Sequence, residues 1–225
     1  MPDVAIPEYV TRDYWWAYAH PFAVWLFDRQ IAVNLILYGN YNRLRDRALE
    51  ALGGTFSGRT LQVGCCYGNL TPHLTERIER AGGSLDVIDV LPIQLNKLAS
   101  KLPKSAPVSL ARMDAAMLSM PDATYDSIIM FLLLHEEPPE YRQKTMLEAL
   151  RVLKPGGRIV IADYAEYAWW HPLRLYFISI LQYLKPNVVD VFHHSLEELI
   201  PAMRAISWQR TSYFGGLFQL MVGEK

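Results

Sequence analysis

The stretch that decides the fold is Thr60-Leu-Gln-Val-Gly-Cys-Cys-Tyr-Gly-Asn-Leu-Thr71, a short apolar run followed by a turn that contains two glycines. Its pattern predicts a buried strand that ends at Gly64, a turn closed by Gly68 and a helix that begins near residue 70. In open α/β sheets, nucleotide-type cofactors bind where such a strand gives way to a helix. The stretch therefore predicts the cofactor-binding edge of a sheet.

Further strand-like runs follow, and helix-length segments separate them. The five runs are Leu61–Val63, Leu85–Ile88, Val108–Leu110, Ser127–Phe131 and Arg158–Ala162, with helical segments around residues 70–80, 92–102 and 139–153. After residue 190 the chain predicts a helix near 195–204 and an antiparallel hairpin from runs 208–214 and 217–222. The alternation predicts an α/β fold of the Rossmann-like kind, with a mostly parallel sheet covered on both faces by helices.

The region before residue 58 is helix-like and unusually aromatic. Its large rings are Tyr14, Trp15, Trp16, Tyr18, Phe22, Trp25, Phe27, Tyr38 and Tyr41. We expect residues 1–57 to form a helical cap within the same domain as the α/β region 58–225, which carries an aromatic insertion around 165–190. Core packing explains part of this aromatic content. A mouth for a flat, lipid-tailed ring or contact with a membrane interface explains the rest.

Composition places the chain among cytoplasmic enzymes. It has 225 residues, 51% of them hydrophobic, and a formal net charge of −1, which disfavours a nucleic-acid partner. The only two cysteines are adjacent, so no disulfide framework is expected. The first residues lack the pattern of a secretory signal. Charged residues interrupt the apolar segment 22–38, so we expect at most peripheral contact with the inner face of the membrane.

The residues at the strand ends favour S-adenosylmethionine (SAM) as the cofactor. Asp89 follows the glycine turn by about 20 residues, the spacing at which a carboxylate can accept hydrogen bonds from ribose hydroxyls. The Gly-x-Gly-x-x-Gly spacing of nicotinamide-binding domains is absent. The turn departs from a common methyltransferase pattern at two positions: Gln62 replaces an acidic residue, and Cys66 replaces the middle glycine.

His135, Glu136 and Asp163 follow the fourth and fifth runs and predict a catalytic or metal-binding group. His135 and Glu136 offer a base, and His135 with Asp163 offers ligands for a hard divalent ion. Plainer interpretations remain open: Asp114 as a helix N-cap, the cysteines as apolar filler, Glu137 as a solvated loop residue and His135 as a structural histidine. The residues His193 and His194 could also bind a metal, but we expect a surface pair instead, since neighbouring helical residues point in different directions.

Five stretches resemble the rhodoquinone biosynthesis proteins called RquA, a divergent group with the class I methyltransferase fold. They are Ala19-His-Pro-Phe-Ala-Val24, Asp28-Arg-Gln-Ile-Ala-Val-Asn-Leu-Ile-Leu-Tyr-Gly-Asn40, Leu61-Gln-Val-Gly-Cys-Cys-Tyr-Gly-Asn-Leu-Thr-Pro72, Leu85-Asp-Val-Ile-Asp-Val-Leu-Pro-Ile-Gln-Leu95 and Leu132-Leu-Leu-His-Glu136. The resemblance covers most of residues 14–200. Its specific part is the His-Pro and Asn-Leu-Ile-Leu-Tyr-Gly-Asn region joined to a Cys-Tyr-Gly turn.

The resemblance implies an enzyme that converts ubiquinone to rhodoquinone by replacing a ring methoxy group with an amino group. It implies SAM as the amino donor and a requirement for manganese (Mn²⁺). By position, the amino-acid part of SAM would lie against Gly64, Cys65, Cys66, Tyr67 and Gly68. Its ribose would contact Asp89 beside Val90, and its adenine amine Asp114 beside Ala115. The metal ligands are not implied, and His135 with Asp163 remains an inference from the residues.

Two other functions fit the same sequence: a conventional SAM-dependent quinone or phenol methyltransferase, and a non-catalytic module that binds quinone or SAM. Gln62 bears on the choice. An acidic residue at this position would pair with the ammonium group of SAM and keep it protonated, whereas a neutral glutamine would leave the amine easier to deprotonate. We therefore expect Gln62 to contribute to amino transfer, alongside His135 and Glu136.

Overall fold

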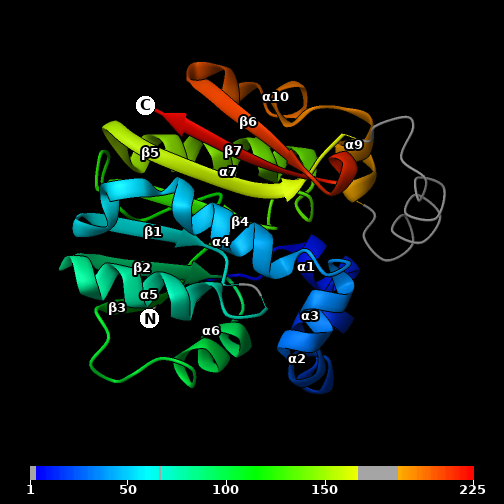
Figure 1. Ribbon diagram of the computed structural model, residues 1–225. Helices are drawn as coiled ribbons and strands as arrows, with labels where there is room; N and C mark the ends of the chain where they lie inside the picture. Colours follow the sequence, from blue (N-terminus) through cyan, green and yellow to red (C-terminus); the bar gives the residue numbers. More distant parts are fainter. Residues whose placement is uncertain (1–3, 66, 167–186) are drawn as a thin grey trace.

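The computed structural model describes residues 4–65, 67–166 and 187–225 (Figure 1). Seven strands in this part of the chain form one sheet in the order β3-β2-β1-β4-β5-β7-β6. They are β1 (Arg59–Val63), β2 (Ser84–Asp89), β3 (Val108–Arg112), β4 (Tyr125–Phe131), β5 (Leu153–Tyr164), β6 (Ser207–Tyr213) and β7 (Phe218–Glu224). The first five strands pair in parallel, and β7 is antiparallel to both β5 and β6. The predicted sheet and closing hairpin are confirmed.

Helices cover both faces of the sheet. Those between or after the strands are α5 (Leu70–Ala81), α6 (Pro92–Ala99), α7 (Pro139–Val152), α9 (Val188–His193) and α10 (Leu196–Leu199). In Figure 1, α5 lies in front of the sheet and α7 lies behind it. The helix expected near 195–204 is instead divided into α10 and the short turn η3 (Pro201–Ala205), because Pro201 has no N–H to continue the helical pattern. The turn η4 (Phe214–Gly216) joins β6 to β7.

The N-terminal region is helical, as expected. It contains α1 (Glu8–Asp13), the π-helical turn η1 (Trp15–Ala19), α2 (Pro21–Phe27), α3 (Gln30–Ile36), α4 (Tyr41–Ala51) and the turn η2 (Gly53–Ser57). Helix α4 packs on the sheet and buries Leu44, Ala48 and Leu49 in the main core. The elements before it lie beyond the carboxyl ends of the strands (Figure 1). They therefore cover the edge at which ligands bind in sheets of this kind.

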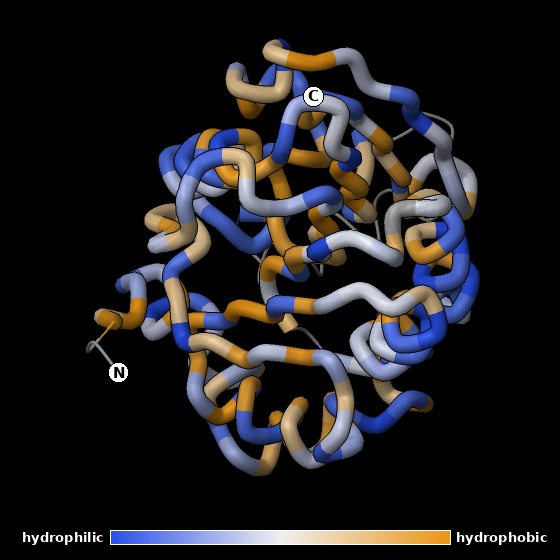
Figure 2. The backbone as a smooth tube through the Cα atoms, turned by 90° about the vertical axis from the view of Figure 1, so that its left-hand side faces the viewer, coloured by the Kyte–Doolittle hydropathy of each residue, from blue (hydrophilic) through white to orange (hydrophobic). Residues whose placement is uncertain are grey.

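The main core lies between the sheet and its helices. Along β4, Ile128, Ile129 and Met130 are fully buried on both faces, which is typical of a central parallel strand. Figure 2 shows apolar residues recurring along the interior strands, whereas many outer turns are polar. Most of the aromatic insertion expected at 165–190 lies outside the described residues, as does Cys66. Within the described part, no helix has the length and apolar character needed to cross a bilayer.

Candidate functional site

The turn after β1 needs glycine at both of its ends. Gly64 has a φ of +77°, and a Cβ there would lie 3.3 Å from the Leu133 side chain. Gly68 has a φ of +98°, and a Cβ there would overlap the Tyr41 ring. Positive φ values are costly for residues with a Cβ, so the backbone itself selects glycine at both positions. The turn thereby brings the main chain close to the neighbouring strand ends.

Asp89, at the end of β2, anchors this turn. Its Oδ2 atom accepts the backbone N–H of Cys65 at 3.0 Å and the Cys65 thiol at 3.2 Å, while Oδ1 accepts the N–H of Leu91 at 2.9 Å. Burial raises the pKa of the Asp89 carboxyl, and the hydrogen bonds from Cys65 and Leu91 oppose that shift. Cys65 is thus a buried partner of Asp89, which agrees with its interpretation as a small filler beneath the turn.

Two adjoining cavities at the strand ends form what we call the strand-end crevice. Their volumes are about 70 and 60 Å³, and both are lined by Tyr9, Gly64, Asp89, Val90 and Leu133. The second cavity adds Asp114 and Ala115. The structure therefore brings together five of the residues expected to bind the cofactor: Gly64, Asp89, Val90, Asp114 and Ala115. Gly68 and Tyr67 do not line this crevice, since Gly68 packs on Tyr41 and Tyr67 faces another cavity.

Helix α1 covers the strand-end crevice. Pro7, Tyr9 and Val10 line it, and Tyr14 follows at the end of the helix. The Arg112 side chain donates a hydrogen bond of 2.6 Å to the carbonyl of Val4, which helps to hold this segment over the strands. A small-molecule site generally needs at least about 300 Å³. With α1 in this position, each of the two cavities is smaller than that, and α1 forms the outer wall of the crevice.

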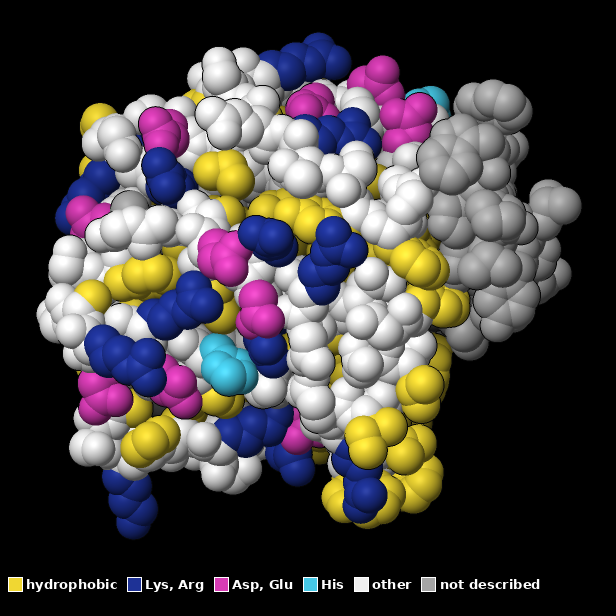
Figure 3. All heavy atoms as spheres, in the orientation of Figure 1, with side chains coloured by type: hydrophobic (Ala, Val, Ile, Leu, Met, Phe, Trp, Pro, Cys, Tyr) yellow, Lys and Arg dark blue, Asp and Glu magenta, His cyan; other side chains and the backbone are white. Residues whose placement is uncertain are grey.

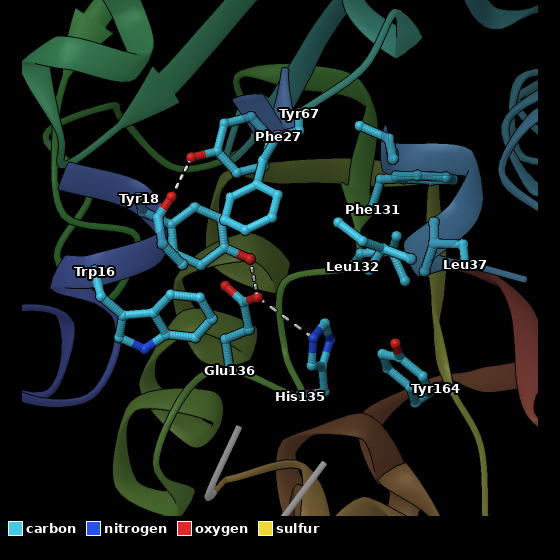
Figure 4. Close-up of a pocket in the computed structure, with 13 residues that line it drawn as sticks. Trp16, Tyr18, Phe27, Leu37, Tyr67, Phe131, Leu132, His135, Glu136 and Tyr164 are labelled. Atoms are coloured by element: carbon cyan, nitrogen blue, oxygen red, sulfur yellow. Dashed lines mark hydrogen bonds and ion pairs between the residues drawn. The ribbon is translucent and has the colours of Figure 1, made fainter. Parts of the chain in front are cut away.

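A separate apolar chamber of about 300 Å³ lies next to the crevice (Figure 4). Its lining comes from the N-terminal elements, the turn after β1 and the ends of β4 and β5: Trp16, Ala17, Tyr18, Phe27, Val33, Ile36, Leu37, Tyr67, Phe131, Leu132, His135, Glu136 and Tyr164. The Tyr18 and Tyr67 rings stack with centroids 5.3 Å apart. Part of the N-terminal aromatic content therefore forms the wall of a cavity, in line with the expectation of an aromatic-lined mouth.

A chain of polar groups crosses the inner end of the chamber. The Oδ1 atom of Asp163 lies 2.7 Å from Nδ1 of His135, and Nε2 of His135 lies 3.5 Å from Oε1 of Glu136. The Tyr18 hydroxyl donates to the same Glu136 oxygen. His135 and Asp163 are each only 1% exposed. The Asp163 carboxylate accepts a hydrogen bond from the Nδ1–H group of His135, which leaves Nε2 of His135 facing Glu136 and the chamber (Figure 4).

The crevice and the chamber meet at this polar chain. Tyr18 and Glu136 line both of them. A cofactor in the crevice and an apolar molecule in the chamber would therefore meet beside His135. The sequence pointed to His135, Glu136 and Asp163 through their places at strand ends. It gave no comparable signal for Tyr18, whose contact with Glu136 joins positions 118 residues apart.

Glu137 is buried, which corrects its interpretation as a solvated loop residue. It is 2% exposed and lines the strand-end crevice on the side of Asp114. Its Oε1 accepts the Thr145 hydroxyl at 2.9 Å, and its Oε2 has no hydrogen-bond partner among the described residues. Burial raises the pKa of Glu137 to about 8, aided by the charges of Asp114 and Asp163. The folded protein thus holds a largely neutral carboxyl group here at neutral pH.

Gln62 lies behind the turn rather than in the apolar chamber. It is 1% exposed, and its Nε2 donates to the carbonyl of Gly64 at 3.0 Å. Its Oε1 is buried without a hydrogen-bond partner among the described residues. Such an unpaired acceptor is uncommon in a folded protein and fits a site that a donor group of a ligand completes. Gln62 lines neither the crevice nor the chamber, and the hydrogen bond from its Nε2 supports the turn at Gly64.

The described residues do not fit the expected metal site. No group of three or more His, Cys, Asp and Glu side chains in this part of the chain is arranged to hold a metal ion. Asp163 and His135, the proposed ligands, instead bind each other through Oδ1 and Nδ1. The pair His193–His194 is exposed, as expected for a surface pair.

Comparison with known proteins agrees with this arrangement. Residues 61–161, from β1 to β5, match the family model described as a methyltransferase domain. An uncharacterised methyltransferase of Synechocystis is 25% identical over 164 residues, 72% of this chain and 73% of that protein. A demethylmenaquinone methyltransferase of Tropheryma whipplei is 28% identical over 150 residues, 65% of this chain and 58% of that protein. The ubiquinone/menaquinone biosynthesis C-methyltransferase UbiE of Pseudomonas paraeruginosa is 29% identical over 139 residues, 60% of this chain and 53% of that protein.

Solved structures show the same fold. A SAM-dependent methyltransferase from Aquifex aeolicus matches with a TM-score of 0.59 at 22% identity, covering 85% of this chain and 96% of that one. The N-methyltransferase NodS of Bradyrhizobium japonicum, in complex with S-adenosyl-L-homocysteine, matches with a TM-score of 0.56 at 16% identity, covering 97% and 94%.

The solved structures show that the chain has the fold of the class I SAM-dependent methyltransferases, and residues 61–161 match a methyltransferase domain. In sequence it is similar, at 28% and 29% identity, to the demethylmenaquinone and UbiE methyltransferases, and it spans little more than half the length of those proteins.

Proposed function

We propose that this protein transfers a methyl group from SAM to a ring carbon of a quinol with an apolar tail. The observation that carries the proposal is the junction of the apolar chamber with the strand-end crevice at Tyr18 and Glu136, beside a buried His135–Asp163 pair. The chamber suits a flat ring with an apolar tail, because its walls are aromatic and aliphatic. The similarity to quinone C-methyltransferases supports the same substrate class.

His135 is the proposed base. Its Nε2 accepts the proton of a quinol hydroxyl, and the resulting phenolate makes the neighbouring ring carbon nucleophilic. Asp163 stabilises the imidazolium through Nδ1 and keeps the ring in one orientation, as a carboxylate does in other His–Asp pairs. When bound, SAM supplies an electrophilic methyl group, so that a carbon–carbon bond forms as a carbon–sulfur bond breaks. The ring proton displaced by the methyl group is released to water.

The remaining residues hold the two ligands. In this proposal Asp89 meets the ribose, Asp114 and Ala115 line the part of the crevice that takes the adenine, and Gln62 supports the turn that faces the amino-acid end of SAM. Tyr18 and Tyr67 form a stacked wall against which a quinol ring can pack. The apolar lining of the chamber offers few polar groups to solvate the phenolate, which strengthens the interaction between the phenolate and His135.

The first test is identification of the product by mass spectrometry after incubation with SAM and a reduced, unmethylated quinol. We expect a methylated quinol and S-adenosylhomocysteine. His135→Gln and Asp163→Asn should each lower kcat by about 10²–10⁴-fold, the usual contribution of a general base. His193→Gln, on the exposed end of α9, is the matched control and should leave kcat unchanged. SAM titration and thermal unfolding would show whether a variant has lost only the base or has failed to fold. Full activity of His135→Gln would show that His135 is not the base.

Amino transfer to ubiquinone is a second candidate, favoured by Gln62. The uncharged side chain stands where an acidic residue would hold the ammonium group of SAM protonated, and its Oε1 is unpaired. The resemblance to the rhodoquinone proteins points the same way. After incubation with ubiquinone, SAM and manganese, amino transfer would be detected by mass spectrometry as a quinone in which an amino group replaces a methoxy group. A protein that binds both ligands and forms neither product would be a non-catalytic module.

A further inference from the structure

The exposed large hydrophobic side chains of the described residues are concentrated in one place. Eight of the ten lie between residues 15 and 36, on η1, α2 and α3, and we call this surface the N-terminal knob. Its members are Trp15, Trp16, Phe22, Trp25, Leu26, Ile31, Leu35 and Ile36, with exposed fractions from 37% to 76%. The other two, Met117 and Leu147, lie outside this segment. A cluster of this kind marks an interaction surface, whereas single exposed apolar residues do not.

The knob protrudes from the body of the protein. Figure 1 shows α2 and α3 extending beyond the sheet and its covering helices. Figure 3 shows hydrophobic side chains gathered at this protruding corner, with basic side chains among them. Short helices that present Trp, Phe and Ile on a convex surface suit penetration into the boundary between lipid headgroups and acyl chains. A stable protein interface, in contrast, more often requires a broad complementary face.

The charges of the knob also suit a bilayer. The Arg29 guanidinium lies 4.0 Å from the centroid of the Trp25 ring, so a cation and an aromatic ring occupy the same exposed site. The one acidic residue between positions 14 and 37 is Asp28, and it is paired with Lys101 and, at 3.6 Å, with Lys97. His20 packs edge-on against Trp15. The knob therefore presents no unneutralised carboxylate to the negative surface of a membrane.

The knob is continuous with the apolar chamber. Trp16 and Ile36 are exposed on the knob and also line the chamber, and Phe27 and Val33 continue that lining inward. Because the knob adjoins the chamber mouth, the surroundings of the knob determine whether a substrate enters the chamber from water or from a membrane. For a molecule with a long apolar tail, that phase is the membrane interior, because transfer of the tail through water is strongly unfavourable.

We propose that the N-terminal knob inserts into the interfacial region of a lipid bilayer and turns the mouth of the apolar chamber toward the acyl chains. Phe22, Ile31 and Leu35 enter the acyl boundary, and Trp25 with Arg29 lies at headgroup level. Bilayer docking does not require the proposed methyl transfer. Direct passage of a quinol from the bilayer into the chamber rests on the proposed function.

Vesicle flotation with the full chain tests the docking. The variant is Phe22→Ser/Ile31→Ser/Leu35→Ser, three exposed positions that do not line the chamber, and the matched control is Met117→Ser/Leu147→Ser. With vesicles of phosphatidylcholine and phosphatidylglycerol, we expect wild type and control to float and the triple variant to lose at least about tenfold in partitioning. Arg29→Glu should weaken binding to the anionic vesicles more than to pure phosphatidylcholine. Thermal unfolding confirms that each variant folds.

Two results would overturn the docking proposal. One is a wild-type protein that stays out of both vesicle types. The other is a triple variant that floats like wild type. Sedimentation analysis that finds a wild-type dimer and a monomeric variant, without flotation, would assign the knob to contact between two copies of the chain. Flotation without any quinol product would leave docking in place and count against the proposed function alone.

Turnover measurements test the passage of substrate. The triple variant should retain its rate on a water-soluble, short-tailed quinol and lose rate on a long-tailed quinol embedded in vesicles. Equal losses on both substrates would show that the knob supports the chamber itself and not access from the bilayer.

Discussion

At the scale of single residues, burial separates groups that look alike in the sequence. Glu136 and Glu137 are consecutive acids after β4, yet Glu136 binds Tyr18 at the chamber and Glu137 is enclosed beside the strand-end crevice. Neighbouring residues in a loop point in different directions, so their positions in sequence could not reveal this difference. The proximity of His135 and Asp163 was easier to predict, since strand ends of a parallel sheet meet at one edge.

The buried Glu137 carboxyl should make stability depend on pH. Its pKa rises from 4.5 to about 8 on folding, so between these values the folded state binds more protons than the unfolded state. The free energy of unfolding should therefore fall as pH rises through this window, by an amount on the order of a few kcal/mol. Glu137→Gln lacks this proton and should show a flatter profile in urea unfolding at several pH values. Glu140→Gln, exposed at the start of α7, should follow wild type.

Asp89 should matter for SAM affinity more than for folding. Asp89→Asn keeps one of the two side-chain oxygens that accept the N–H groups of Cys65 and Leu91, and it loses the charge that a ribose hydroxyl would meet. We expect SAM binding to weaken by about 1–3 kcal/mol, the range for a charge-assisted hydrogen bond. Isothermal titration calorimetry measures this change. Asp126→Asn, at the opposite end of the sheet beside Lys154, is the control, and equal SAM affinity in both variants would exclude Asp89 from the site.

At the scale of secondary-structure elements, the sequence of α1 gives no signal that this helix lies over the strand-end crevice. It contributes a single side chain, Val10, to the buried set, and the main core cluster begins only at Val33. Its position over the crevice depends on long-range contacts, such as that of Arg112 with Val4. Local patterns predicted the helical character of this region, but they could not show which ligand site it covers.

Removal of residues 1–13 should therefore weaken SAM binding and leave the fold of the remaining chain intact. We expect cooperative thermal unfolding to persist, because the truncation leaves the sheet and α4 intact. SAM should bind more weakly and dissociate faster, because Pro7, Tyr9 and Val10 no longer cover the crevice. Stopped-flow displacement of SAM gives the dissociation rate, and Tyr9→Ala should show a smaller change in the same direction. Loss of cooperative unfolding would place α1 in the core, and an unchanged dissociation rate would mean that it does not cover SAM.

At the scale of the whole molecule, the sequence predicted well where the strands lie along the chain and which of them are parallel or antiparallel. The alternation of apolar runs with helical segments depends on local periodicity, and β1 to β5 follow it closely. The division of the binding edge into a polar crevice and an apolar chamber was not predictable in this way. It arises where η1, the turn after β1 and the end of β4 meet, and the contact of Tyr18 with Glu136 has no local signature.

The placement of α1 and the knob on different walls has a kinetic consequence. The crevice is lined by α1 and strand ends without any residue of α2 or α3, whereas the chamber takes its outer wall from those two helices. An enzyme whose knob is inserted in a bilayer can thus release its demethylated, water-soluble cofactor to the aqueous side and remain bound to the membrane. The turnover rate would then depend on the surface density of the quinol in one vesicle, and not on the bulk concentration of the quinol. A single enzyme molecule could convert many quinol molecules of one vesicle before it dissociates from that vesicle.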